Sequence, residues 1–180
     1  MEEEKLVKNL KQGDIEAREF LVVHTQSYLF NVIFQVVRDR ALAEDILEET
    51  FLKAFKYIKS FKGESRLLTW LYRIAMNIAK EELKKEKRVE LTKIPQDENI
   101  PAEFTLDEKK KIIWEGLSHL STEDREIITL IDIQGLPYDD VSYVLGIPEG
   151  TVKSRIARAR DRLREEILKN NFFDKINGTF

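Results

Sequence analysis

A run of basic and hydroxyl residues near the C-terminus has the helical spacing that suits contact with DNA. In a helix of 3.6 residues per turn, the apolar residues that share one buried stripe are Val152, Ile156, Ala159 and Leu163. The residues that fall on another side, within an arc of about 100°, are Thr151, Ser154, Arg155, Arg158 and Arg162. Hydroxyl and guanidinium groups in such an arc suit phosphates and the base edges of a major groove. The alternative is a solvated arginine face in an ordinary helical bundle.

A short helix and a tight turn are predicted directly before this basic helix. Val141 and Leu145 share one face of the short helix, and Gly146 follows it. Glycine readily adopts the left-handed conformation that such a turn requires. The spacing predicts a helix-turn-helix, and its coincidence with the basic arc favours DNA binding over a solvated face.

A long helix predicted from about Leu67 to Arg88 carries a second functional pattern. Its apolar stripe consists of Leu67, Leu71, Ile74 and Ile78. A different flank combines an aromatic ring, an amide and four cations, which are Trp70, Arg73, Asn77, Lys80, Lys84 and Arg88. Aromatic rings stack on unpaired bases, amides bond base edges and cations follow phosphates, so this flank suits melted DNA. The alternative is that Trp70 belongs to the core and that the lysines only aid solubility.

A third surface has the opposite charge and lies on a helix predicted from about Ala41 to Tyr57. Asp45, Glu48, Glu49 and Leu52 point outward together, with Phe51 toward the edge of the patch. Acids around an exposed leucine suit docking to a basic protein surface. The alternative is a solvated face that carries an ordinary Glu49–Lys53 pair.

Composition predicts an all-α protein. The 180 residues include only 7 Gly and 4 Pro, whereas 35% are charged, and strands need the turns that Gly and Pro supply. The N-terminus lacks an apolar secretory core, and no run of about 18 uncharged apolar residues is present. We therefore expect a soluble, cytoplasmic chain that does not insert into a membrane.

The sequence predicts no catalytic residue, cofactor or metal site. Cysteine is absent, which excludes disulfides, thiol nucleophiles and thiolate zinc sites. The two histidines, His24 and His119, each lie in an apolar helical context, and no P-loop, GxGxxG or HExxH string occurs.

Pattern breaks divide the chain into two small helical domains joined by a flexible linker. The predicted limits are 1–88 for the first domain, 89–107 for the linker, 108–170 for the second domain and 171–180 for a frayed tail. The linker holds Pro95 and Pro101 and lacks an apolar period. The net charge of −3 argues against indiscriminate nucleic-acid binding.

Three long segments resemble one family in the expected order and spacing. They read ALAEDILEETFLKAF, FKGESRLLTWLYRIAMNIAKEEL and LSTEDREIITLIDIQGLPYDDVSYVLGIPEGTVKSRIARARDRL. They are similar to the extracytoplasmic-function (ECF) group of bacterial sigma-70 factors, and the resemblance extends from about Leu6 to Glu166. It implies a sigma-two domain, a linker and a sigma-four domain with the helix-turn-helix.

The resemblance also implies a role for each surface. The docking surface, which would bind core RNA polymerase, consists of Asp45, Glu48, Glu49, Phe51 and Leu52. The −10 surface, which would recognise and melt the −10 element, consists of Phe61, Lys62, Gly63, Glu64, Ser65, Arg66, Trp70, Arg73, Asn77, Lys80, Lys84 and Arg88. The −35 surface, which would read the −35 duplex, consists of Thr151, Lys153, Ser154, Arg155, Arg158 and Arg162.

The expected partners are core RNA polymerase, promoter DNA and an anti-sigma factor, which in this family is often membrane-anchored. The alternative function is a polymerase-independent helix-turn-helix regulator. That alternative accounts for the C-terminal domain but leaves the acidic surface and the Asn77 flank unexplained.

Overall fold

The computed structural model describes residues 2–89 and 108–169, and within these ranges it contains helices and short connections but no strand. The helices are α1 (Glu3–Gln12), α2 (Ile15–Val37), α3 (Arg40–Tyr57), the 3-10 turn η1 (Ile58–Ser60), α4 (Leu67–Val89), α6 (Glu108–Ser118), α7 (Thr122–Ile128), the π-helical segment η2 (Thr129–Ile133), α8 (Tyr138–Leu145) and α9 (Glu149–Lys169). The all-α prediction is confirmed. The predicted linker, apart from Val89, and the predicted tail lie outside the described residues.

Local signals in the sequence set several helix ends. The Asp14 carboxylate accepts a hydrogen bond from the Ala17 amide at 3.2 Å and caps α2. The Ser121 hydroxyl accepts one from the Asp124 amide at 3.2 Å and caps α7. Gly146 ends α8 in the left-handed conformation, with φ at 66°. These capping and turn positions are the ones that the sequence pattern predicts.

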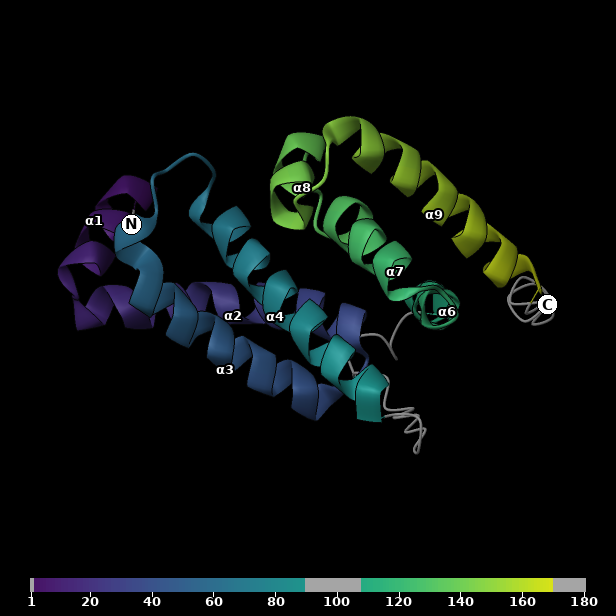
Figure 1. The fold of residues 1–180 in the computed structure, drawn as a ribbon, viewed down its shortest axis with the longest axis horizontal. Coiled ribbons are helices and arrows are strands. Elements are labelled where there is room, and N and C mark those ends of the chain that lie inside the picture. The colour runs from purple at the N-terminus through teal and green to yellow at the C-terminus, as the bar shows by residue number, and fades with distance from the viewer. Residues whose placement is uncertain (1, 90–107, 170–180) are drawn as a thin grey trace.

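Helices α1 to α4 form the N-terminal helical group (Figure 1). The long helices α2, α3 and α4 pack pairwise, and α1 packs against α2. Their shared core is mainly apolar and includes Leu29, Ile33, Ile46, Leu71 and Ile78. Removing these side chains from water is the main force that holds the group together.

Helices α6 to α9 form the C-terminal helical group, in which α9 packs on α6, α7 and α8. Trp114, Leu117, Ile127, Val141 and Ile156 are buried at its centre. Figure 1 shows α9 along the outer edge of this group, with α7 and α8 nearer to α4. The basic helix is therefore displayed on the side away from the N-terminal group.

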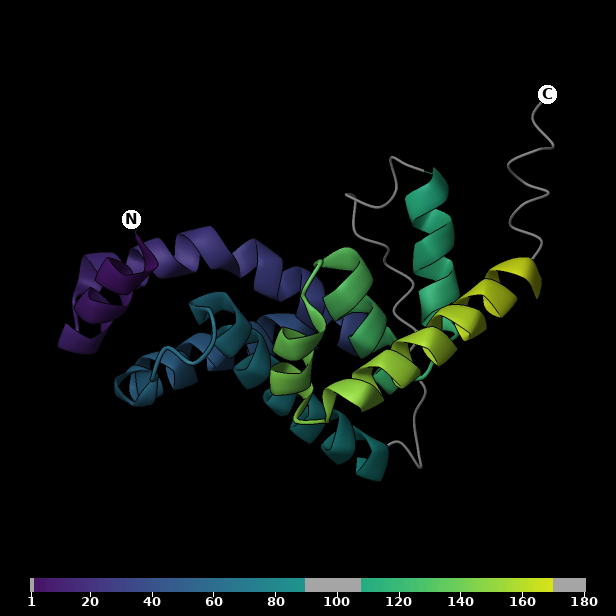
Figure 2. The same ribbon diagram turned by 90° about the horizontal axis from the view of Figure 1, so that it is seen from above.

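The two helical groups pack directly against each other. Contacts join α4 to α8, and α2 to α7 and η2. The ring of Phe34 on α2 stacks on that of Trp114 on α6, with 5.1 Å between their centroids. Both views show the C-terminal group against one end of the N-terminal group (Figures 1 and 2). One continuous apolar core therefore extends through both groups.

Helix α2 combines length with an apolar sequence. An 18-residue window of this 23-residue helix has a mean hydropathy of 1.4, so the helix is long and apolar enough to cross a membrane by length and composition. Polar residues such as Gln26, Ser27 and Asn31 interrupt the apolar run without adding charge. The central helix of a soluble protein passes the same test, and α2 contacts α1, α3, α4 and α7.

Candidate nucleic-acid and polymerase-binding surfaces

The −35 surface lies on α9, directly after the turn of the helix-turn-helix. The Ser142 hydroxyl donates to the Ile147 carbonyl at 2.6 Å and holds the turn. Val152, Ile156 and Ala159 are buried, as the apolar stripe predicts. Lys153, Ser154 and Arg158 are exposed, whereas Thr151 and Arg155 are half-buried. The first turns of α9 therefore present hydroxyl and cationic groups to solvent.

Two members of the −35 surface are held by acids of the protein itself. Nη1 of Arg162 donates to both carboxylate oxygens of Asp124, at 2.9 and 2.7 Å, and Asp124 is only 4% exposed. This pair ties α9 to α7. Lys153 lies 2.6 Å from Glu149 in an exposed pair of the kind that contributes little to stability. The structure thus separates Arg162, which braces the fold, from the freer residues toward the start of α9.

The −10 surface combines an exposed loop with one flank of α4. Residues 62–64 and Arg66 are exposed, and Asn77 and Lys84 project into solvent from α4. Phe61 is only 6% exposed, and its ring lies 5.2 Å from the half-buried ring of Trp70. Phe61 therefore anchors the loop in the core. The side chain of Arg88 lies outside the described residues.

The C-terminal helical group covers two cations of the −10 surface. Cζ of Arg73 lies 4.3 Å from the ring centroid of Tyr143 on α8, a cation–π contact. Nζ of Lys80 lies 3.0 Å from Oε1 of Glu126 on α7, and Glu126 is 2% exposed. Burial raises the pKa of the Glu126 carboxyl, and the Lys80 ammonium opposes that shift.

Two further polar contacts join α4 to the C-terminal helical group. The Tyr72 hydroxyl donates to Oε1 of Gln134 at 3.0 Å, and burial raises the pKa of Tyr72 to about 12. Thr69 is buried, and its hydroxyl lies close enough to the Asp140 carboxyl to lower the pKa of that group, which burial raises. The flank of α4 that was assigned to DNA is thus also a protein interface.

The docking surface lies on α3, and four of its five predicted members face outward. Asp45 and Glu48 are exposed, and Leu52 is 62% exposed. Glu49 pairs with Lys53 at 2.8 Å, the contact that the ordinary solvated face also predicts. Phe51 differs from its predicted place at the edge of the patch. It is 8% exposed and belongs to the core, stacked on Phe55.

Comparison with known proteins identifies the two helical groups. Residues 21–89 match the family model "Sigma-70 region 2", and residues 110–163 match "Sigma-70, region 4". An ECF RNA polymerase sigma-E factor of Haemophilus influenzae is 33% identical, over 90% of this chain and 93% of its own length. The RNA polymerase sigma-H factor of Pseudomonas aeruginosa is 31% identical, over 90% and 92%. The chain belongs to the ECF group of sigma-70 factors.

Solved structures of sigma factors share this fold. The sigma factor RpoE of Bartonella quintana, solved with the anti-sigma factor NepR, is 29% identical with a TM-score of 0.70, and the match covers 85% of this chain and 97% of that one. CnrH, solved with the cytosolic domain of CnrY, has the same fold with a TM-score of 0.70 at 22% identity, over 94% and 98%.

Membership of the sigma family gives the chain its function. As a sigma factor it binds core RNA polymerase and directs transcription initiation at promoters, reading −35 duplex and melted −10 DNA. Sigma factors are not enzymes in themselves. Within the described residues, no cluster of three or more His, Asp or Glu side chains has the geometry to hold a metal ion. The polymerase-independent regulator is not favoured.

The contacts between the two groups of this sigma factor had no local signal in the sequence. Glu126, Gln134, Asp140 and Tyr143 lie on α7, η2 and α8 and were not assigned to any site. They meet α4 because of how the groups dock, which periodicity along one helix does not encode. Glu126 follows Asp124 and Arg125 in the sequence, so its local context did not mark it as a buried carboxylate.

Proposed function

We propose that the two DNA elements are read by the individual residues of the −35 and −10 surfaces. The observation that carries this proposal is the outward face of the first turns of α9, where Ser154 and Arg158 are exposed and the apolar stripe is buried. A helix placed this way after a tight turn enters a major groove and contacts base edges with its N-terminal residues. Arg155 is the residue best placed for base reading.

The −10 surface has the chemistry for a melted strand. Asn77 offers an amide, Trp70 an aromatic ring and Lys84 a cation along one flank of α4. Single-stranded DNA is bound by stacking and by cations that follow the backbone. The exposed loop of residues 62–66 lies at the start of this flank and supplies further contacts.

The contacts of Arg73 and Lys80 imply that the two helical groups separate during initiation. In the described arrangement both cations are engaged by Tyr143 and Glu126. DNA phosphates compete for these cations only after α7 and α8 move away from α4. Polymerase supplies the binding energy for that movement through the docking surface, so promoter binding depends on polymerase.

We infer that this sigma factor acts on soluble RNA polymerase. We also infer that an anti-sigma factor regulates it. The support for regulation is the similar Bartonella quintana sigma factor, which was solved with one. An anti-sigma factor that binds both helical groups would hold them in an arrangement that withholds α4 from DNA.

The roles of the surfaces are tested by reconstituted transcription with bacterial core polymerase and a promoter library. Asp45→Arg combined with Glu49→Arg should weaken core association, because the docking surface is acidic. The matched control is Glu16→Arg with Glu19→Arg, which makes the same charge change on exposed residues of α2. Equal core association by both double variants would remove the docking role from α3.

A further inference from the structure

Helix α1 contacts both ends of the loop in the −10 surface, although it precedes the residues that match Sigma-70 region 2. At the start of the loop, Nζ of Lys11 donates a hydrogen bond to the Phe61 carbonyl at 2.7 Å. At its end, the Leu67 amide donates to Oε1 of Glu3 at 3.0 Å. Two side chains from opposite ends of one short helix thus hold the first and last residues of the segment.

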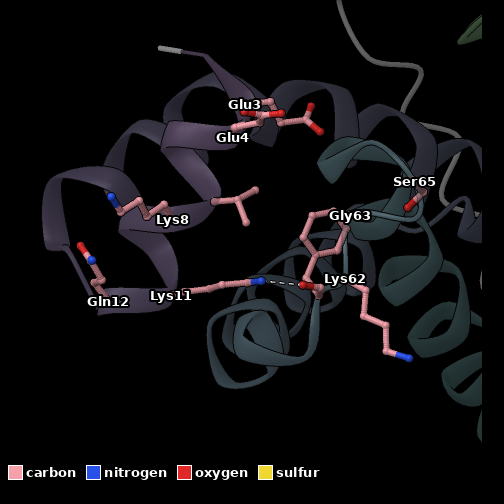
Figure 3. Close-up of a pocket in the computed structure, with 10 residues that line it drawn as sticks. Glu3, Glu4, Lys8, Lys11, Gln12, Lys62, Gly63 and Ser65 are labelled. Atoms are coloured by element: carbon pink, nitrogen blue, oxygen red, sulfur yellow. Dashed lines mark hydrogen bonds between the residues drawn. The ribbon is translucent and has the colours of Figure 1, made fainter.

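The space between α1 and the loop is an open groove of about 730 Å³. Figure 3 shows Lys8, Lys11 and Gln12 along one side and the loop residues Lys62, Gly63 and Ser65 across from them. The dashed line in Figure 3 is the bond from Lys11 to the loop. Helix α1 therefore forms the wall opposite the loop.

Each contact restrains a point where the loop would otherwise be free to move. Leu67 is the first residue of α4, and its amide is one of the helix donors that lack a partner within the helix. A carboxylate at that position also interacts favourably with the helix dipole. Phe61 is the last core residue before the exposed segment, and the bond from an ammonium to its carbonyl is charge-assisted.

The segment between these anchors is short and has few other restraints. Gly63 has φ at +75°, a left-handed conformation that other residues rarely adopt, and a side chain there would meet no atom within 4 Å. Lys62 and Glu64 form an exposed pair at 4.0 Å, which restrains little. The path of the loop is therefore determined mainly by its two ends.

We propose that Lys11 and Glu3 are positioning residues that hold the loop in the conformation that reads the −10 element. This inference rests on the proposed role of the loop in −10 recognition. Neither residue needs to touch DNA. Losing either anchor lets the loop adopt other conformations. Its contacts to the bases of the −10 element then weaken more than its contacts to the DNA backbone, which is the same in every sequence.

The test is transcription by core polymerase and the full chain from promoters that share a −35 element and are randomised at −10. Lys11→Met and Glu3→Ala should each lower the preference for the best −10 sequence by about tenfold, a change of about 1.4 kcal/mol in discrimination. Lys11→Arg should retain most of the preference, because arginine still donates to the Phe61 carbonyl. Lys5→Met is the control, since Lys5 is an exposed lysine of α1 outside the groove lining.

The outcomes separate a positioning role from a structural one. A uniform loss on all −10 sequences, with an unchanged ranking, means that α1 only stabilises the domain and overturns the proposal. Should Lys11→Met unfold the chain, as circular dichroism would show, Glu3→Ala tests the other anchor independently.

A loop variant separates failure of this inference from failure of the proposed function. Lys62→Ala alters an exposed loop residue and leaves both anchors in place. If Lys62→Ala changes the −10 ranking while Lys11→Met and Glu3→Ala do not, only the positioning role is wrong. If Lys62→Ala also leaves the ranking unchanged, the loop does not read the −10 element. Both the positioning role of α1 and the proposed role of the loop are then wrong.

Discussion

The −35 surface and the −10 surface differ in how many of their side chains already contact other parts of the protein. The open part of the −35 surface lies on one helix, on which Lys153, Ser154 and Arg158 are exposed. The −10 surface lies on α4 and a loop, and α7 and α8 engage two of its cations, Arg73 and Lys80. A duplex can meet the first surface without rearrangement, whereas a melted strand can meet the whole of the second only after the helical groups separate. We therefore expect binding and melting of the −10 element to depend on movement of the helical groups, and binding of the −35 duplex not to depend on it.

Locking the two helical groups together should have the largest effect. The chain has no cysteine, so Thr69→Cys with Asp140→Cys introduces the only two thiols, at neighbouring side chains of α4 and α8. Oxidising them to a disulfide before core polymerase is added should abolish promoter opening, and reduction of the disulfide should restore it. Permanganate reactivity of the −10 thymines measures opening.

The two single-cysteine variants, treated with the same reagent, control for modification alone. Normal opening by the bridged protein would contradict the view that α4 must be uncovered before it binds the −10 strand.

The sequence predicted features that depend on neighbouring residues along the chain. The caps at Asp14 and Ser121 and the buried stripe of α9 follow from helix periodicity and hydrogen-bonding rules, which act within one or two turns. The order of the helices and the turn at Gly146 follow from the same local signals.

Features that depend on distant segments could not be predicted in the same way. Arg162 falls on the basic arc, but its guanidinium binds Asp124, 38 positions earlier in the chain. Phe51 falls at the edge of an exposed patch, but the packing around α3 buries it. A helical wheel gives the angle of a side chain and not the identity of what lies beside it.

Removing the best candidate for base reading should have the next largest effect. Arg155→Ala should cost about 1–3 kcal/mol in promoter binding and relax specificity at one position of the −35 element. The measurement is transcription by the holoenzyme from promoters substituted at each −35 position. Arg164→Ala, an exposed arginine further along α9, is the control. An equal loss on every sequence would make Arg155 a phosphate contact.

A smaller effect is expected when Asn77 is replaced, because only one amide group is lost. Asn77 is exposed on α4 and is not among the residues covered by Tyr143 and Glu126. Asn77→Ala should slow promoter opening by about three- to tenfold, as loss of one hydrogen bond worth about 1 kcal/mol implies. Closed-complex formation should be unchanged. Permanganate kinetics that match those of the unaltered protein would remove Asn77 from the melting step.

The smallest effect tests the cover over the −10 surface one contact at a time. Tyr143→Leu keeps an apolar side chain on α8 but removes the ring that lies against Arg73. Cation–π contacts at partly exposed sites contribute about 0.5–1 kcal/mol, so the separated state should become about two- to fivefold more populated. The readout is the rate at which a thiol reagent labels Thr69→Cys, because residue 69 is buried beside Asp140 when the groups are packed.

Tyr57→Leu is the matched control for that experiment. Its ring also lies near a cation, that of Lys56 at 5.3 Å, but both residues belong to α3. Losing that ring should leave the labelling rate of residue 69 unchanged, because no contact between the helical groups is removed. If both leucine variants raise the rate equally, the increase reflects general loosening of the fold. If neither does, the Arg73–Tyr143 contact does not hold the groups together, and the cover over α4 depends on the Lys80–Glu126 pair and the apolar interface.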